Sequence, residues 1–414
     1  MWIRTGTMLL LCLAPAAGRA DEPCPGAGDA WALARCAAAR GEAVRRARHE
    51  LEAAQGRQRT AQHLLPANPT LDLMVGRRRT EAGATDVDRG VELSQAFEVG
   101  GQRGARVALA EGEVRAAAAR LEAARRQVTI DVLAAAVEVW RARLAGRFAS
   151  EQRALAQRLV EVSTARVREG VGPALDLELA EAARVQAHRE ELASARLVRE
   201  AGARLALLVG GAVELADGAI TVAAPDRPRA ELVREAQQRR SLVQQARAEL
   251  EAGQRRLELL ERERIPSVTL GASYRHEEFS DVGALRLSVP LPLFRRNQGA
   301  ILEQQAQNAG AGVAEEQARL KVALEVEEAH EAWTRARALA ALVGPDLERR
   351  LAADAESLRD AYQRGTMPLP AALAGLREVF GARRTVADAR AEVTLATLDL
   401  LTAIGGSPQP EAGP

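Results

Sequence analysis

Aromatic side chains are scarce in this chain: Phe, Trp and Tyr together make up 3% of its 414 residues. Ala, Leu, Arg and Glu are abundant instead, which is typical of long helices that pack closely through small side chains. The composition therefore argues against a compact α/β enzyme.

An excess of one charge is also missing. Lys and Arg number 57, Asp and Glu number 56, and Lys321 is the only lysine. Binding to nucleic acid or to an anionic membrane surface by counterion release requires a basic excess, so neither is expected as a partner. We expect most charged side chains to lie on solvated faces.

Catalytic and metal-binding motifs are absent from the sequence. It contains no nucleophile elbow, Walker loop or HExxH motif, and its five histidines are scattered. Beyond residue 20 the only methionines are Met74 and Met367, so no array of soft ligands exists. Because metal sites need clustered ligands, we expect no catalytic, cofactor-binding or metal-binding residues, and no enzymatic activity.

Long apolar runs are confined to the start of the chain. Residues 1–20 combine an early arginine, an apolar stretch and small residues at the end, which is the pattern of a secretory signal peptide. Lipidation is the alternative, but Cys12 follows a leucine and Cys24 follows Asp-Glu-Pro, whereas lipidation signals favour a small preceding residue. No later run reaches 18 apolar residues, so we expect an exported chain in which any membrane span is built from strands.

The chain repeats itself at a spacing of about 195 residues. The stretch "NPTLDLMVGRRR" from Asn68 reappears as "IPSVTLGASYRH" from Ile265, and "VELSQAFEVGGQR" from Val91 reappears as "LRLSVPLPLFRRN" from Leu285. The order is the same in both halves. This duplication predicts two structural repeats of the same architecture.

Each repeat is predicted to contain a helix, two strands and a long helical hairpin. The first repeat covers 21–211, with strands at about 69–79 and 88–99 and a hairpin at about 102–209. The second covers 230–406, with strands at about 266–277 and 283–293 and a hairpin at about 297–404. A connector, 212–229, joins the repeats, and 407–414 forms a tail.

The predicted strands alternate apolar and polar residues. Leu71, Leu73 and Val75 share one face, and Asp72 and Gly76 share the other. This period of two fits a strand between lipid and a wet lumen, but a half-buried soluble sheet has the same period. The strands alone do not decide between the two.

The predicted hairpins are long enough to favour an elongated structure. Val107, Val114 and Leu121 recur every seven residues, and no proline interrupts 102–168, which predicts a coiled-coil helix about 100 Å long. The helix after Asn297 is expected to run equally far. Glycines followed by proline are expected to form the two hairpin tips, at Gly170, Val171 and Gly172 and at Gly365 and Thr366.

Four stretches in register carry a resemblance to a known family. "FEVGGQRGAR", "VREGVGPALDLELAEA", "LSVPLPLFRRNQGAI" and "YQRGTMPLPAALAGLREVF" resemble the TolC family of outer membrane factors over nearly the whole exported chain. The Glu-Val-Gly-Gly-Gln-Arg version is most similar to the CusC and CzcC heavy-metal-efflux branch. The resemblance implies a mainly α fold with internal duplication and a location in the cell outer membrane.

The same resemblance implies an assembly and a function. Three copies would each give four strands to a twelve-stranded transmembrane β-barrel, and their antiparallel coiled-coil helices would form a periplasmic α-barrel. Such channels are passive exit ducts of tripartite pumps, with a periplasmic adaptor and an inner membrane transporter, here of the RND type, as partners. Heavy-metal cations are the implied cargo. Multidrug efflux or type I protein secretion is the alternative, and a periplasmic coiled-coil adaptor or scaffold a more remote one.

Two sets of residues are expected to shape the duct where the backbone changes direction. The strand-to-helix junctions are assigned to Gly100, Gly101, Gln102 and Arg103 in the first repeat and to Pro290 and Pro292 in the second. The resemblance places adaptor docking and the closing aperture at the hairpin tips.

Acidic residues near the first tip are candidates for an aperture. The TolC pattern has aspartates in the second repeat where this chain has Ala371 and Ala374, but Asp176 and Glu178 remain in the first. A threefold ring of carboxylates would attract cations. Alternatively, Asp176 simply occupies the first turn of a helix, where the helix dipole favours a negative charge.

The two cysteines beyond residue 20 are expected either to form a disulfide or to remain reduced. Cys24 and Cys36 both survive signal removal, and the periplasm is oxidising. A bond would attach the N-terminal segment to the first helix. Without it, Cys36 would be buried among alanines.

Overall fold

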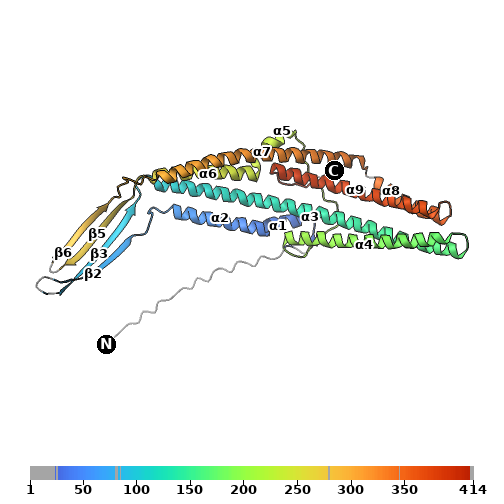
Figure 1. The fold of residues 1–414 in the computed structure, drawn as a ribbon, viewed down its shortest axis with the longest axis horizontal. Coiled ribbons are helices and arrows are strands. Elements are labelled where there is room, and N and C mark those ends of the chain that lie inside the picture. Colours follow the sequence, from blue (N-terminus) through green and yellow to red (C-terminus); the bar gives the residue numbers. More distant parts are fainter. Residues whose placement is uncertain are drawn as a thin grey trace, which may run out of the picture.

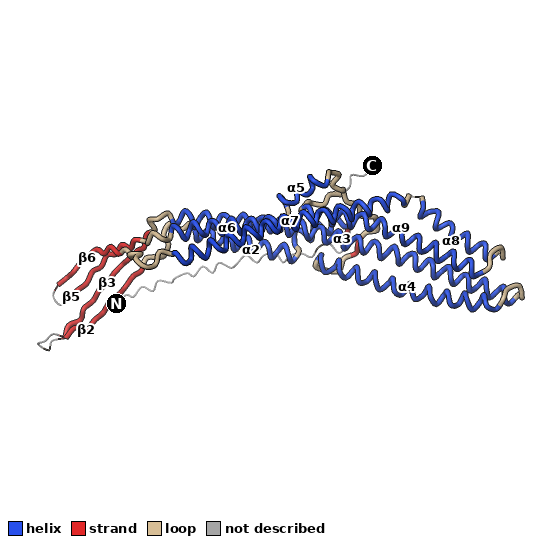
Figure 2. The backbone as a smooth tube through the Cα atoms, turned by 45° about the horizontal axis from the view of Figure 1, so that its top comes forward, coloured by secondary structure: helices blue, strands red, loops and turns tan. Residues whose placement is uncertain are grey.

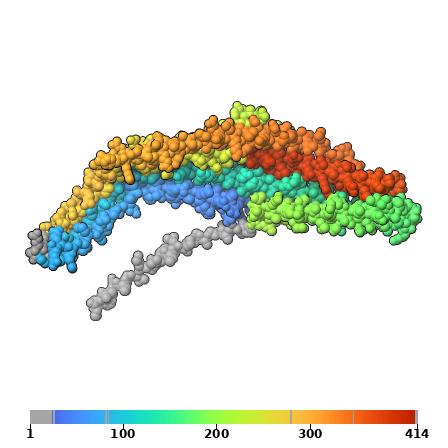
Figure 3. Space-filling view, in the orientation of Figure 1, coloured from blue at the N-terminus to red at the C-terminus, as the bar shows by residue number. Residues whose placement is uncertain are grey.

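The computed structural model describes residues 24, 27–79, 83, 85–277, 280–344 and 346–410. The expected signal peptide lies outside these residues. The chain forms an elongated, bent body with strands at one end and two helical hairpin tips at the other (Figures 1 and 3). The predicted class, mainly α with four long antiparallel strands and an internal duplication, is confirmed.

Nine helices make up most of the described chain (Figure 2). The helices of the first repeat are α1 (Ala30–Arg40), α2 (Glu42–Ala61), α3 (Gln102–Arg168) and α4 (Ala174–Val209). Those of the second are α5 (Arg229–Arg239), α6 (Ser241–Arg262), α7 (Gln298–Leu342), α8 (Leu347–Gln363) and α9 (Leu369–Ile404). None of the helices in the described part of the chain combines the length and apolarity that crossing a membrane requires.

The second hairpin departs from the expected continuous helix. α3 runs unbroken for 67 residues, but its counterpart is divided into α7, which ends at Leu342, and α8, which begins at Leu347. The sequence has Gly344 and Pro345 between them. Proline lacks a backbone N–H and its ring clashes with the preceding helical turn, so the heptad pattern cannot continue as one helix there.

Four antiparallel strands form a single sheet in the order β2-β3-β5-β6. They are β2 (Thr70–Arg79), β3 (Thr85–Phe97), β5 (Val268–Glu277) and β6 (Ser280–Ser288). β3 ends at Phe97 instead of near 99, and β6 ends at Ser288 instead of near 293. Pro290 and Pro292 cannot donate to a strand ladder, which explains the early end of β6.

A second, two-stranded sheet lies away from the main one. β1 (Ala27–Gly28) pairs in parallel with β4 (Glu214–Leu215), which belongs to the segment joining the two repeats. α5 follows this segment and packs against α7 near the middle of the molecule (Figure 1).

The hydrophobic core is thin and rich in alanine. One cluster lies around α1, α3, α7 and the end of α9, and a second lies between the two hairpins toward their tips. Ala34, Ala37 and Ala136 are fully buried in the first cluster. Small side chains let the helix backbones approach closely, which explains why so few aromatic residues are needed.

α3 and α7 begin with the same device in both repeats. In the second repeat, the predicted junction residues Pro290 and Pro292 follow the end of β6, and α7 begins only at Gln298. Gly101 and Asn297, the residues before α3 and α7, adopt left-handed conformations with φ of 78° and 61°. The first residue of each helix is a glutamine whose Oε1 accepts a hydrogen bond from the backbone N–H two residues earlier. The distances are 2.8 Å for Gly100 to Gln102 and 2.7 Å for Arg296 to Gln298.

The first junction is also tied to the second repeat. Gln102 Nε2 donates to the carbonyl of Ile265, just before β5, at 2.7 Å. Gly100 is buried there, and a Cβ at its position would lie 2.7 Å from Ile265 Cβ and 3.1 Å from the Arg262 carbonyl. Because one contact is with backbone, this position has no room for a side chain.

We therefore expect Gly100→Ala to lower the free energy of unfolding by about 1 to 3 kcal/mol through overpacking. Gly104→Ala is the matched control, because nothing lies within 4 Å of a Cβ there and α3 gains up to about 1 kcal/mol of helix propensity. Thermal unfolding of both variants in mild detergent measures the difference. Equal stability of the two variants would contradict the packing argument.

Candidate functional site

The main sheet exposes its apolar face. Cross-strand pairs such as Leu71 with Leu93 and Leu73 with Val91 place apolar side chains on one side of the sheet. These side chains are open, with Leu73 74% exposed and Leu285 on β6 91% exposed. A soluble half-buried sheet would cover this face instead, so the structure favours contact with an apolar medium.

The opposite face of the sheet is polar and crossed by ion pairs. Arg78 on β2 lies 3.0 Å from Asp88 on β3 and 3.5 Å from Glu277 on β5. Arg286 on β6 lies 3.0 Å from Glu92 on β3. These pairs link all four strands through side chains that a wet lumen can solvate.

The sheet has two open edges. Within the described residues, β2 and β6 each pair with a single strand, and every residue of β6 is exposed. An unpaired edge presents a row of N–H and C=O groups that need partners. In an apolar medium these groups can be satisfied only by another strand.

The two hairpin tips lie together at the far end of the molecule from the sheet (Figure 1). Gly170 and Gly365 adopt left-handed φ values of 73° and 76°, which glycine tolerates without strain. The backbone N–H of Val171 donates to Arg166 O at 3.0 Å, and that of Thr366 donates to Ala361 O at 3.0 Å. The predicted tip residues thus occupy two equivalent turns.

A buried polar cluster joins the two hairpins just behind these turns. Ser163 Oγ on α3 and the Tyr362 hydroxyl on α8 form a 2.7 Å hydrogen bond, with exposed fractions of 0% and 1%. The Arg166 guanidinium lies 5.6 Å from the centre of the Tyr362 ring. Burial raises the pKa of Tyr362, and the charge of Asp176 adds to the rise.

Asp176 and Glu178 occupy different environments. Asp176 is half-buried in the first turn of α4, and its carboxylate interacts with the Tyr362 hydroxyl. Glu178 is exposed. The structure therefore brings Asp176, but not Glu178, to the cluster between the hairpins. Ser163 and Tyr362 were not predicted from the sequence; the only hint is that Tyr362 is one of just two tyrosines.

A second contact joins the hairpins closer to the middle of the molecule. Arg383 on α9 is buried, and its Nη1 lies 2.5 Å from Glu151 Oε2 on α3. Its guanidinium lies 4.2 Å from the centre of the Phe148 ring. The two repeats are thus joined in two places, one near the hairpin tips and one closer to the middle of the molecule.

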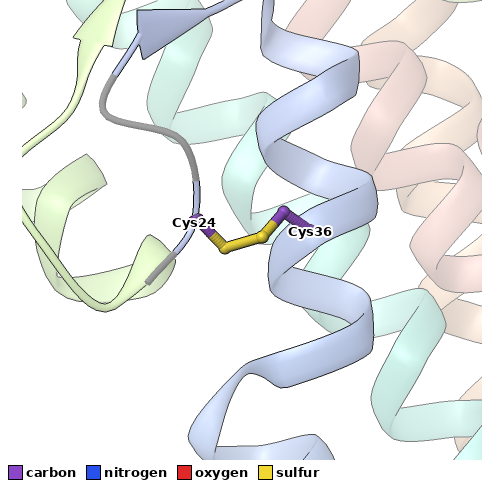
Figure 4. Close-up of a disulfide and its surroundings, with 2 residues drawn as sticks. All are labelled: Cys24 and Cys36. Carbon is purple, nitrogen blue, oxygen red and sulfur yellow. A yellow bond between two sulfur atoms is a disulfide. The ribbon is translucent and has the colours of Figure 1, made fainter. Parts of the chain in front are cut away.

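Cys24 and Cys36 are joined by a disulfide, with their Cα atoms 5.8 Å apart. Figure 4 shows Cys24 beside α1, reaching across to Cys36 on that helix. In the part of the chain that the structure describes, no three His, Cys, Asp or Glu side chains are grouped as a metal site.

The family model for outer membrane efflux proteins matches residues 33–211 and 232–406, one segment in each repeat. The cobalt-zinc-cadmium resistance protein CzcC of Cupriavidus metallidurans is 27% identical over 237 residues, or 56% of this chain and 56% of that protein. The chain thus matches little more than half of this relative's length.

Solved structures of channel proteins have the same fold. CusC superposes with a TM-score of 0.75 at 17% identity, covering 92% of each chain. VceC of Vibrio cholerae superposes with a TM-score of 0.74 at 19% identity, covering 91% of this chain and 95% of VceC. At these identities the likeness concerns the fold alone.

We expect the Ser163–Tyr362 hydrogen bond to be energetically coupled. Ser163→Ala and Tyr362→Phe should each lower the free energy of unfolding by about 1 to 2 kcal/mol, because each variant leaves the other residue's buried hydroxyl without its hydrogen-bond partner. The double variant should lose less than the sum, by about 1 kcal/mol. Ser357→Ala, an exposed serine on α8 that bonds only its own helix, is the control and should change stability by less than about 0.5 kcal/mol. Strict additivity in the double-mutant cycle would show that the two hydroxyls do not act together.

Proposed function

Because the chain belongs to the outer membrane efflux protein family, also called the TolC family, we propose that it is the exit duct of a tripartite pump for heavy-metal cations. It is an outer membrane efflux channel, not an enzyme, and its helices extend into the periplasm.

The exposed apolar face of the main sheet is the observation that best supports the proposal of a membrane channel. An apolar face left open and a polar face crossed by ion pairs suit a wall between lipid and water. Four strands are too few to close a barrel, since closed outer membrane barrels begin at about eight. We infer that three copies join β6 of one to β2 of the next and complete twelve strands.

Heavy-metal cargo is supported by sequence likeness. The name of CzcC refers to cobalt, zinc and cadmium resistance. The Glu-Val-Gly-Gly-Gln-Arg stretch at the first junction resembles the CusC and CzcC branch. A passive duct needs no binding site for its cargo. An inner membrane transporter of the RND type and a periplasmic adaptor would select and deliver the cations.

The hairpin tips are the proposed site of adaptor docking and of the closing aperture. Gly170, Val171, Gly172, Gly365 and Thr366 form the exposed turns at the end remote from the sheet. The adjacent Ser163–Tyr362 cluster holds the two hairpins together at this level. The tips are therefore suited to both roles.

Deleting the gene from its own bacterium should lower the tolerated concentrations of Co²⁺, Zn²⁺ and Cd²⁺. Plasmid-borne wild-type protein should restore tolerance, and an inactive transporter should remove the benefit of the channel. Tolerance to uncharged drugs, measured in parallel, is the internal control. Sensitivity to drugs alone, with unchanged metal tolerance, would reject the metal cargo and favour multidrug efflux.

Asp176 is proposed to contribute a carboxylate to the aperture in the trimer. Asp176→Ala should lower cation selectivity and weaken block by divalent ions, because a threefold ring would lose three negative charges. Single-channel conductance in planar bilayers measures both, with Glu181→Ala, an exposed carboxylate further along α4, as control. If selectivity and block are unchanged, Asp176 serves only the first turn of α4 and its contact with Tyr362.

A further inference from the structure

The Cys24–Cys36 disulfide lies where the N-terminal segment meets the connector between the repeats. β1 follows Cys24 and pairs with β4, and the backbone N–H of Ala216 donates to Gly28 O at 3.0 Å. Leu215 of β4 is buried in the main hydrophobic cluster, against which Cys24 also packs. We call the disulfide, β1 and β4 together the clasp.

The connector side of the clasp is held from a second direction. Arg143 on α3 donates from Nη1 to Leu215 O at 2.6 Å. The start of the connector therefore lies between the N-terminal segment and the long helix of the first repeat.

The second repeat closes in an equivalent way without a covalent bond. Before α5, Val222 forms a bridge to Pro410, which follows α9, and the N–H of Ala223 donates to Gln409 O at 3.0 Å. In each repeat, the segment before the first helix thus pairs with the segment after the last. Only in the first does a disulfide reinforce the contact.

Chain connectivity explains this difference. The segment around Val222 continues into the chain on both sides, whereas the expected cleavage of the signal peptide leaves β1 attached only through α1. Two-residue strands pair too weakly to hold such an end by themselves. The bond from Cys24 to Cys36 on α1 supplies the second attachment.

We propose that Cys24 and Cys36 are a thiol-oxidation site for a periplasmic disulfide-donor protein, and that their oxidation sets the clasp. The two thiols give up two protons and two electrons, the donor's disulfide is reduced to a dithiol, and the new S–S bond forms through a mixed disulfide. Cys12 lies in the expected signal peptide, so the exported chain has one possible intramolecular pair and needs no disulfide isomerisation.

The bond has a further chemical consequence. Once Cys24 Sγ is bonded to Cys36 Sγ, it cannot also form the thioether bond to a diacylglycerol group. The disulfide-bonded chain is therefore not lipid-anchored through Cys24. The proposal requires export to the periplasm but no particular cargo, so it stands or falls independently of metal efflux.

Thiol alkylation tests the oxidation step. Protein purified from wild-type cells should take up alkylating reagent at neither cysteine before reduction and at both afterwards, as measured by intact mass. In cells that lack the periplasmic disulfide donor, both should react before reduction, and an added small-molecule disulfide should restore the bond. Two reactive thiols in protein from wild-type cells would overturn the proposal.

Hydrogen exchange tests the clasp itself. Reduction of the native protein with a soluble phosphine should speed amide exchange at Ala216 by at least about tenfold, because β1 loses its second attachment. Ala223 is the matched control, since its N–H makes the same kind of bond at the same distance in the second repeat. The variant Cys24→Ser/Cys36→Ser should exchange at the faster rate with or without the donor. Unchanged exchange at Ala216 after reduction would show that the disulfide does not hold the clasp.

Discussion

Lipid offers no hydrogen bonds, and this single constraint governs the sheet end of the molecule. Every backbone N–H and C=O at membrane depth must pair within the protein, yet among the described residues β2 and β6 each pair with a single strand. The apolar face of the same sheet is open and its polar face is crossed by ion pairs. In the proposed assembly, a single chain therefore carries one part of a wall that further copies close.

The same constraint explains the abrupt change from strand to helix. A strand needs neighbours to satisfy its backbone, whereas a helix satisfies its own, so the long helices can continue beyond the edge of the sheet. Gly101 and Asn297 turn the backbone with left-handed φ angles. The side-chain oxygens of Gln102 and Gln298 accept hydrogen bonds from the backbone N–H groups two residues earlier. Beyond the junctions, alanine-rich helices pack closely enough to form a wall without a thick core.

The parts of this architecture that depend on local periodicity were predictable from sequence. The heptad pattern from Val107 onward predicts α3, and the alternation around Leu73 predicts β2. The matching stretches from Asn68 and Ile265 indicate the duplication. The end of β6 was placed too late, although Pro290 was already assigned to the junction, and the break after α7 was missed, although Pro345 carries the signal. In both places the apolar pattern continues past a proline, which cannot donate a backbone hydrogen bond to a strand or a helix.

The contacts between the hairpins had no comparable signal. Ser163 and Tyr362 lie 199 residues apart, and neither stands out in its own helix. The sequence likewise left open whether Cys24 and Cys36 are joined, because pairing depends on where the N-terminal segment lies against α1. Such contacts follow from how two repeats meet in space, which no pattern within one segment records.

The oligomeric state in mild detergent tests the central claim most directly, namely that the open sheet is closed by other copies of the chain. Native mass spectrometry of the purified protein, after release from the micelle, counts the copies. The account predicts one species of three chains that disappears only under denaturing conditions. A monodisperse monomer, or a chain that stays in solution without detergent, would contradict it.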